Sequence, residues 1–195
     1  MKIKRVFAYL IDTTFVFFIS LVIFALPFFT KYQEQYINNT EEVYKNIMES
    51  GSAEMTEEEN INALYNINSS LLPFLIINAG TTIFYFGILS YMTNCQTFGK
   101  KIMRLKVESV KNKEVKPYLY ILREILITGF IFKIINILLI INCGASKWYL
   151  YNNALSNAST FVYSLIVGFI IFRDDERGLH DLICQTEVIE ISKKK

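Results

Sequence analysis

Four long apolar stretches divide the sequence, and each is long enough, or nearly long enough, to cross a membrane. They cover residues 6–29, 71–91, 119–141 and 154–172. A helix rises about 1.5 Å per residue, so roughly 20 apolar residues span a hydrocarbon core of about 30 Å. The last stretch is the least regular, because its first turn is polar. The pattern predicts an all-α membrane protein with four transmembrane helices, folded as a single domain over residues 1–195.

Positive charge is unevenly distributed between these stretches. Of the 20 Lys and Arg, fifteen lie at the N-terminus, in the inner basic loop 92–118 or in the tail 173–195; three lie in the other connections and two within 119–141. Positive charge in short loops marks the cytoplasmic side, so both termini are predicted to be cytoplasmic. This alternation requires an even number of spans, which supports the fourth helix.

The outer loop, residues 30–70, is acidic and carries two helix-start patterns. Thr40 precedes EEVYKNIMES and then Gly51, an N-cap with a glycine stop, and Thr56 with Glu59 forms a capping-box pattern. We expect two short amphipathic helices over the extracytoplasmic face. They are either a lid or surface for a protein partner, or a solvated acidic spacer.

The inner basic loop has a strand pattern instead. Apolar and charged residues alternate from Met103 to Val107, a turn pattern follows at 111–114, and a short returning strand is expected through Val115. The tail segment 186–191 also has strand character. These patterns predict a small cytoplasmic β-hairpin to which the tail adds a third strand, because a lone hairpin is marginal in water.

The composition of the chain argues against several classes of function. The chain is 52% hydrophobic with a mean hydropathy of +0.31, and its net charge of only +2 argues against nucleic-acid binding. Cys95, Cys143 and Cys184 are widely spaced, which predicts three free thiols and gives no support to a metal site. No nucleophile and base pair or phosphate loop is visible, so neither an enzyme nor a cofactor is expected.

Ionisable residues within the apolar stretches are the candidates for function, because charge at membrane depth needs compensation. Asp12 and Tyr85 come out about 9 Å from the cytoplasmic interface, and Arg123 about 6 Å from it. The three are predicted to meet in an inner polar layer.

A second set lies in the outer half of the spans. Lys133 and Asn78 come out roughly 12 and 10 Å from the outer surface, and Asn136 and Thr82 lie near them on the same helix faces. We predict an outer polar layer from these four residues. Together the two layers either line a hydrated path with Asp12 as an exchanging carboxylate, or are satisfied pairs that fix helix packing.

Three short motifs resemble those of the RDD family of bacterial membrane proteins. Arg5-x-x-Ala8-x-x-Ile11-Asp12 opens the first span, the inner loop runs from Thr97-Phe98-Gly99-Lys100 to Val107, and Leu179-His180-Asp181 precedes Thr186 in the tail. The family is named for one arginine and two aspartates, which fall here on Arg5, Asp12 and Asp181. Arg104 departs from the pattern, since a glycine is usual there.

The resemblance implies a bacterial plasma-membrane protein that transports ions or small solutes, with cation/proton exchange as one implied activity. The alternative is a non-transporting scaffold or accessory subunit that binds a protein partner. We expect a homo-oligomer, because four thin helices leave little room for a pore of their own. His180 is interpreted as a group that orients Asp181 through a hydrogen bond.

Overall fold

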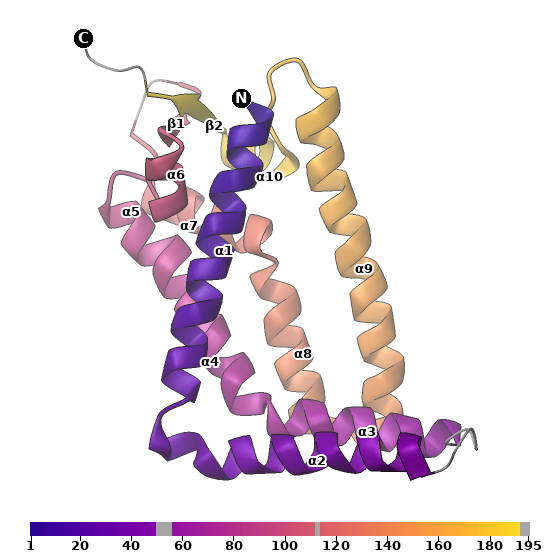
Figure 1. Cartoon of the computed structure of the whole chain (residues 1–195). Coiled ribbons are helices and arrows are strands. Elements are labelled where there is room, and N and C mark those ends of the chain that lie inside the picture. The colour runs from indigo at the N-terminus through magenta and orange to yellow at the C-terminus, as the bar shows by residue number, and fades with distance from the viewer. Residues whose placement is uncertain (50–55, 112–113, 192–195) are drawn as a thin grey trace.

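Long helices stand on a layer of two helices that runs across one end of the molecule (Figure 1). The computed structural model describes residues 1–49, 56–111 and 114–191. The upright helices are α1 (Lys2–Phe24), α4 (Leu72–Thr82) continued by the π-helix η2 (Ile83–Leu89) and α5 (Ser90–Met92), α8 (Phe130–Asn142) and α9 (Ala145–Phe172).

Three of these are long and apolar enough to cross a membrane: Lys2–Phe24, Leu72–Met92 and Ala145–Phe172. In the most apolar window of α9, only 6% of the residues are buried inside the protein. Such a helix needs lipid or another chain around it, because water would leave its apolar surface uncompensated. The prediction of a membrane protein is therefore supported by how little of these helices the fold itself covers.

The predicted span over residues 119–141 is not one straight helix. It is divided into α7 (Pro117–Thr128) and α8, which are bent by 64° about Gly129. Gly129 has φ +61°, a left-handed conformation that ends α7. The described residues thus hold three helices that are long and apolar enough to cross a membrane, or four such segments if this bent pair counts as one.

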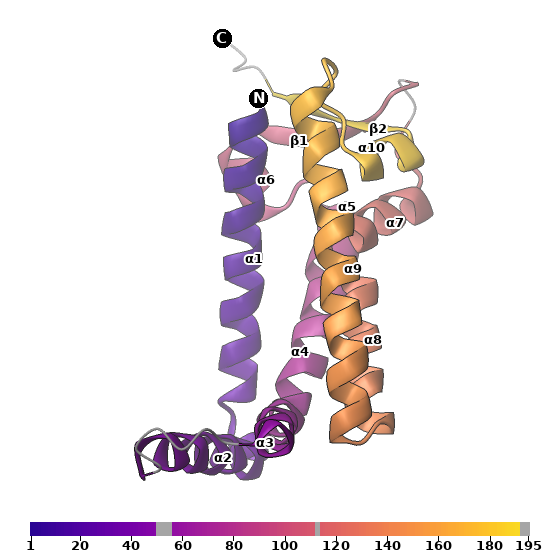
Figure 2. The ribbon, with the colours of Figure 1, turned by 90° about the vertical axis from the view of Figure 1, so that its right-hand side faces the viewer.

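The layer at the far end is made by α2 (Thr30–Glu49) and α3 (Glu57–Ser70), which follow the short η1 (Pro27–Phe29). Figure 2 shows both helices lying across the ends of the upright helices. The capping box is confirmed, since Thr56 Oγ1 accepts the Glu59 amide at 3.3 Å and Glu59 Oε2 accepts the Thr56 amide at 2.9 Å. Thr40 does not begin a helix, because α2 already starts ten residues earlier, and Gly51 lies outside the described residues.

The opposite end, here called the sheet end, carries α6 (Phe98–Ile102), α10 (Leu179–Cys184) and a two-stranded antiparallel sheet. Strand β1 (Leu105–Ser109) pairs directly with β2 (Thr186–Glu190). The predicted partner strand through Val115 does not form, and the predicted turn at 111–114 lies partly outside the described residues. The tail strand, placed third in the prediction, is thus the direct partner of β1.

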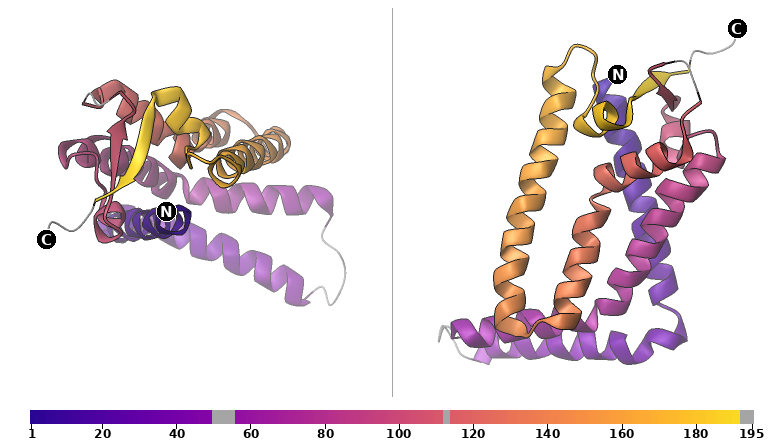
Figure 3. Two further views of the ribbon diagram at one scale, coloured as in Figure 1. Left: turned by 90° about the horizontal axis from the view of Figure 1, so that it is seen from above. Right: turned by 180° about the vertical axis from the view of Figure 1, so that it is seen from behind.

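The sheet end is built around the start of α1, as seen from above in Figure 3. Leu105 and Val107 of β1 and Val188 of β2 face a core that also holds Ala8 and Tyr120. The charged residues between them on the strands lie on the other face, which is the alternation that the sequence predicts. The sheet therefore closes over the first turns of α1 and the start of α7.

The far end has its own packed contact. Trp148 of α9 is only 3% exposed and packs edge-on against Tyr65 of α3. The Tyr65 hydroxyl donates to the carbonyls of Ile140 and Cys143 at the end of α8. Tyr65 therefore joins α3 to α8 through its hydroxyl and to α9 through its ring contact with Trp148. The three cysteines are free, as predicted.

Candidate functional site

One face of α1 is buried from Ala8 to Phe24. The buried residues are spaced four apart: Ala8, Asp12, Val16, Ser20 and Phe24. Residues at this spacing share a helix face. The face therefore presents a carboxylate and a hydroxyl to the protein interior, with an apolar residue between them.

Asp12 is 1% exposed and accepts three hydrogen bonds. The Tyr85 hydroxyl donates to Oδ1 at 2.6 Å, the Gly99 amide donates to Oδ1 at 2.7 Å, and the Thr97 hydroxyl donates to Oδ2. The Tyr85 oxygen in turn accepts the Phe98 amide. Of the predicted inner polar layer, Asp12 and Tyr85 are thus brought together, and their shared partner is the start of α6.

Gly99 is where α6 meets α1. A Cβ atom on Gly99 would lie 2.2 Å from the carbonyl oxygen of Ala8 and 3.0 Å from the Asp12 carboxyl carbon. Only a residue without a side chain allows this approach, and Ala8 keeps the facing surface small. The inner-loop motif therefore docks on α1 through a close backbone contact as well as through Asp12.

Arg123 belongs to a different cluster. Its Nε donates to Asp181 Oδ1 at 2.8 Å and its Nη1 to Glu124 Oε1 at 2.5 Å, rather than to Asp12 as predicted. Lys100 Nζ donates to the same Glu124 oxygen at 2.9 Å, and Arg5 Nη1 lies 3.6 Å from Asp181 Oδ2. We call these five residues the charge cluster. The reason for the difference is Gly129, because the bend places α7 against α10 and not alongside the middle of α1.

Asp181 is the most constrained member of the charge cluster. It is fully buried and also accepts from the Thr186 hydroxyl at 3.1 Å and the Gly178 amide at 3.3 Å. Burial raises the pKa of Asp181, but the nearby Arg123 guanidinium outweighs it and holds that pKa well below the usual range. His180 Nε2 lies 3.4 Å from Asp181 Oδ2, and burial lowers the pKa of His180.

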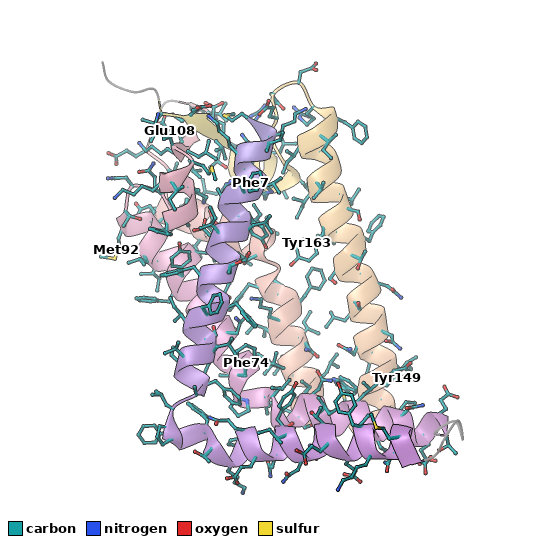
Figure 4. All side chains as sticks on the ribbon, viewed as in Figure 1. Phe7, Phe74, Met92, Glu108, Tyr149 and Tyr163 are labelled. Carbon is teal, nitrogen blue, oxygen red and sulfur yellow. The ribbon has the colours of Figure 1, made fainter. Side chains whose placement is uncertain are left out.

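A cavity of about 220 Å³ lies between α1, α7, α9 and α10. Its polar end is formed by charge-cluster residues together with Lys2, Asp12 and His180, and its walls are apolar. Tyr163 of α9, labelled in Figure 4, lines it and is turned toward the α7–α8 break. The wall residues are Val6, Ala8, Tyr9, Phe86, Leu105, Ile127, Tyr163, Ile166, Val167, Ile170 and Val188.

The predicted outer polar layer is assembled around Lys133. Its Nζ donates to Asn78 Oδ1 at 2.8 Å and to Thr82 Oγ1 at 2.9 Å, and Asn78 donates onward to Ser20 at 3.2 Å. Asn136 does not join this hydrogen-bond network as predicted, since its buried Oδ1 has no hydrogen-bond partner among the described residues. We call Ser20, Asn78, Thr82 and Lys133 the lysine group.

Sequence reasoning missed Glu124 and Ser20. Glu124 stands beside Arg123 within an apolar stretch, and an adjacent pair of opposite charges there was a usable signal. Ser20 lies eight residues after Asp12 on the same helix face, so its position could also have been read from the spacing. No group of three or more His, Cys, Asp or Glu within the described ranges is placed to hold a metal ion.

Comparison with known proteins agrees with these motifs. The sequence matches the RDD family over residues 3–185, nearly the whole chain. The chain belongs to the RDD family. Arg5, Asp12 and Asp181, on which the resemblance places the family's arginine and two aspartates, are all at the sheet end, where Asp12 anchors α6 and Asp181 joins Arg5 to Arg123.

Arg104, where this RDD protein departs from the usual glycine, has φ +57°. That left-handed conformation follows α6 and explains why a glycine suits the position. This protein therefore makes the left-handed turn with an arginine, which is less suited to it than glycine. Strand β1 still starts at Leu105.

The chain is also similar to an uncharacterized protein, YxaI, of Bacillus subtilis strain 168. The two are 24% identical over 135 residues, which is 69% of this chain and 68% of that protein. No solved structure matches the chain.

Proposed function

We propose that this RDD-family protein is a multi-pass plasma-membrane transporter for ions or small solutes, with both termini and the sheet end in the cytoplasm. The main support for transport is the cavity at the sheet end, which reaches Asp12, Glu124 and His180 between membrane-crossing helices. The excess of Lys and Arg in the segments of this end supports the orientation.

An apolar layer on α1 and η2 lies between the cavity and the lysine group. Val16, Tyr85 and Phe86 form a buried cluster one turn past Asp12, and Ser20 of the lysine group follows one turn later. A solute crossing the membrane would have to pass this layer. The π-helix η2, which carries Tyr85 and Phe86, and the left-handed Gly129 are the two irregular points nearby, and we expect the movement there.

Asp12 and Glu124 have different roles in this proposal. Both oxygens of Asp12 are taken by partners that hold α6, so we assign Asp12 to positioning. The hydrogen bonds that Lys100 and Arg123 donate to Glu124 both end on Oε1, and Glu124 lines the cavity. Glu124 is therefore the carboxylate we assign to binding and exchange.

Flux measurements on purified protein in lipid vesicles test the transport proposal. We expect the native chain to dissipate an imposed proton or cation gradient, Glu124→Gln to lose this activity, and Glu108→Gln on the exposed face of β1 to keep it. Thermal unfolding of each variant shows that it is folded. A native chain that gives no flux above empty vesicles, at several pH values and with several cations, refutes transport by exchange.

The second candidate is a scaffold or accessory subunit that binds a protein partner on the acidic α2–α3 layer. Both oxygens of Asp12 already accept hydrogen bonds from protein donors. This favours the second candidate, because these bonds hold the sheet end as a fixed unit. We expect that reversing the exposed charges of Glu34, Glu41 and Glu42 would then abolish a crosslinked complex in cells. Under the transport proposal the same variants keep their flux. The same crosslinking reports whether the chain forms a homo-oligomer.

A further inference from the structure

Helix α2 exposes three large apolar side chains on one side. Ile37 is 51%, Tyr44 62% and Met48 82% exposed, and they follow one another at seven and four residues, a spacing that keeps them on one side of a helix. We call these three residues the α2 stripe. More than half of the surface of each is left uncovered by the described part of the chain. A continuous apolar stripe of this kind marks a surface that contacts a membrane or another protein.

The α2 stripe lies on the side of α2 that is turned toward the upright helices. The Gln33 side-chain amide of α2 donates to the carbonyl of Phe24, at the end of α1, at 2.6 Å. Ile37 and Tyr44 follow Gln33 by four and eleven residues, which is about one and about three helical turns, so they lie on the same side of the helix. Figure 2 shows α2 lying across the ends of the upright helices. The stripe is therefore turned toward the level at which these helices end.

The other side of α2 is polar. Gln35, Asn38 and Glu42 are exposed there, roughly half a turn round the helix from Gln33. Over Thr30–Glu49 the helix carries four glutamates and two lysines. A helix with one apolar side and one charged side, lying across the ends of membrane-crossing helices, matches those that lie in the plane of a bilayer interface.

The level of α2 along the upright helices agrees with such an interface. Helix α1 has 23 residues, about 34 Å, slightly more than the roughly 30 Å of a hydrocarbon core. The chain leaves α1 through η1, whose Phe28 is 89% exposed. Helix α2 therefore begins where the hydrocarbon core would end, and the lipid chains lie on the side to which the α2 stripe is turned.

We propose that α2 is bound to the bilayer surface at the far end, with Ile37, Tyr44 and Met48 inserted among the first carbons of the lipid chains. The surface that fits the stripe is lipid and not protein. Because α2 carries more carboxylates than amines, apolar contact and not attraction to anionic lipid holds it there. The polar side stays in water. This inference does not depend on whether the protein transports a solute.

Spin labels on single cysteines test this inference with the purified full chain in phosphatidylcholine vesicles. In a cysteine-free background, Ile37→Cys and Tyr44→Cys are compared with Gln35→Cys and Glu42→Cys on the polar side. Oxygen concentrates in hydrocarbon and a nickel chelate in water, so the ratio of their collisions with each label reports its depth. We expect this ratio to be roughly 10-fold higher on the stripe than on the polar side, because only the stripe enters the lipid.

Two results would overturn the inference. Equal ratios on both sides of α2 would place the stripe in water, and stripe labels that neither reagent reaches would show that a second copy or a protein partner covers it. Met48→Cys is a third stripe position, in case one of the first two variants does not fold. Adding phosphatidylglycerol to the vesicles is expected to leave the contrast unchanged. A contrast that appears only with this anionic lipid would contradict binding by apolar contact.

Discussion

Asp12 and Asp181 are both buried carboxylates, and they are compensated in different ways. Asp12 accepts from two hydroxyls and one amide, all neutral donors, whereas Asp181 lies beside two guanidinium groups. Neutral donors fix a carboxylate in one geometry, and charged partners compensate its buried charge. Asp12 therefore joins α1 to α6, and Asp181 joins the tail to α1 and α7.

The contact between Gly99 and Ala8 gives a prediction about stability. Gly99→Ala forces a Cβ against the Ala8 carbonyl, which belongs to rigid helix backbone, so α6 must move away from Asp12. We expect the free energy of unfolding in micelles to fall by about 1–3 kcal/mol. Gly168→Ala in α9 is the control, because nothing lies within 4 Å of its added Cβ. Equal stability of both variants would contradict the docking of α6 described here.

The stability of the sheet end is expected to depend on pH. The folded state lowers the pKa of His180 mainly by burial, so below about pH 6.5 the unfolded chain binds a proton that the folded chain does not. Stability is therefore complete above that pH and falls as the pH drops. Asp181, whose pKa is also lowered, adds a second loss as the pH falls below about 4.

Thermal unfolding of the native chain and His180→Gln between pH 5 and 7.5 measures the first effect. His180 is the only histidine in the sequence, so the variant should lose most of the slope in this range. A slope that is the same in both proteins would show that another group titrates.

At the scale of the elements, the break between α7 and α8 decides what the third apolar stretch does. Residues 119–141 are apolar enough for one span, and the sequence pattern continues through Gly129 without interruption. The hydroxyl of Tyr163 would lie 1.7 Å from a Cβ at Gly129. A residue of α9, 34 positions later in the chain, therefore occupies the place of a side chain at the break. The break itself carries Arg123 and Glu124 toward α10.

Replacing Gly129 should test this packing. We expect Gly129→Ala to lose roughly 1–3 kcal/mol of stability, from its left-handed backbone and from the clash with Tyr163. Combining it with Tyr163→Leu should recover part of the loss, because the hydroxyl is removed. Tyr163→Leu alone completes the double-mutant cycle. Strictly additive effects would mean that the two residues do not meet.

At the scale of the whole molecule, the two ends have different constructions. The far end is a flat layer of two helices, and the sheet end is a compact unit that brings together the N-terminus, the inner basic loop and the tail (Figure 1). Three segments far apart in sequence meet at the sheet end, through β1 with β2 and through the charge cluster, whereas at the far end α3 packs against α8 and α9. Function is therefore expected at this end.

The orientation of the two ends can be measured in cells. In a cysteine-free background, Lys147→Cys and Lys101→Cys place exposed thiols at the far end and the sheet end. We expect a membrane-impermeant maleimide to label residue 147 in intact cells and residue 101 only after permeabilisation, because the Lys and Arg excess retains the sheet end in the cytoplasm. The reverse pattern of labelling would invert the topology.

The sequence by itself determined the membrane class, the family, the capped helix at Thr56 and the pairing of Lys133 with Asn78 and Thr82. These features rest on local composition or on helix periodicity, which a linear pattern contains. The tertiary structure alone decided that Arg123 bonds to Asp181 and Glu124, that β1 pairs with the tail, and that a cavity lies beside Arg5. Each of these features depends on the bend at Gly129 or on a contact between distant segments. The spacing of apolar and polar residues along the sequence predicts neither the bend nor such a contact.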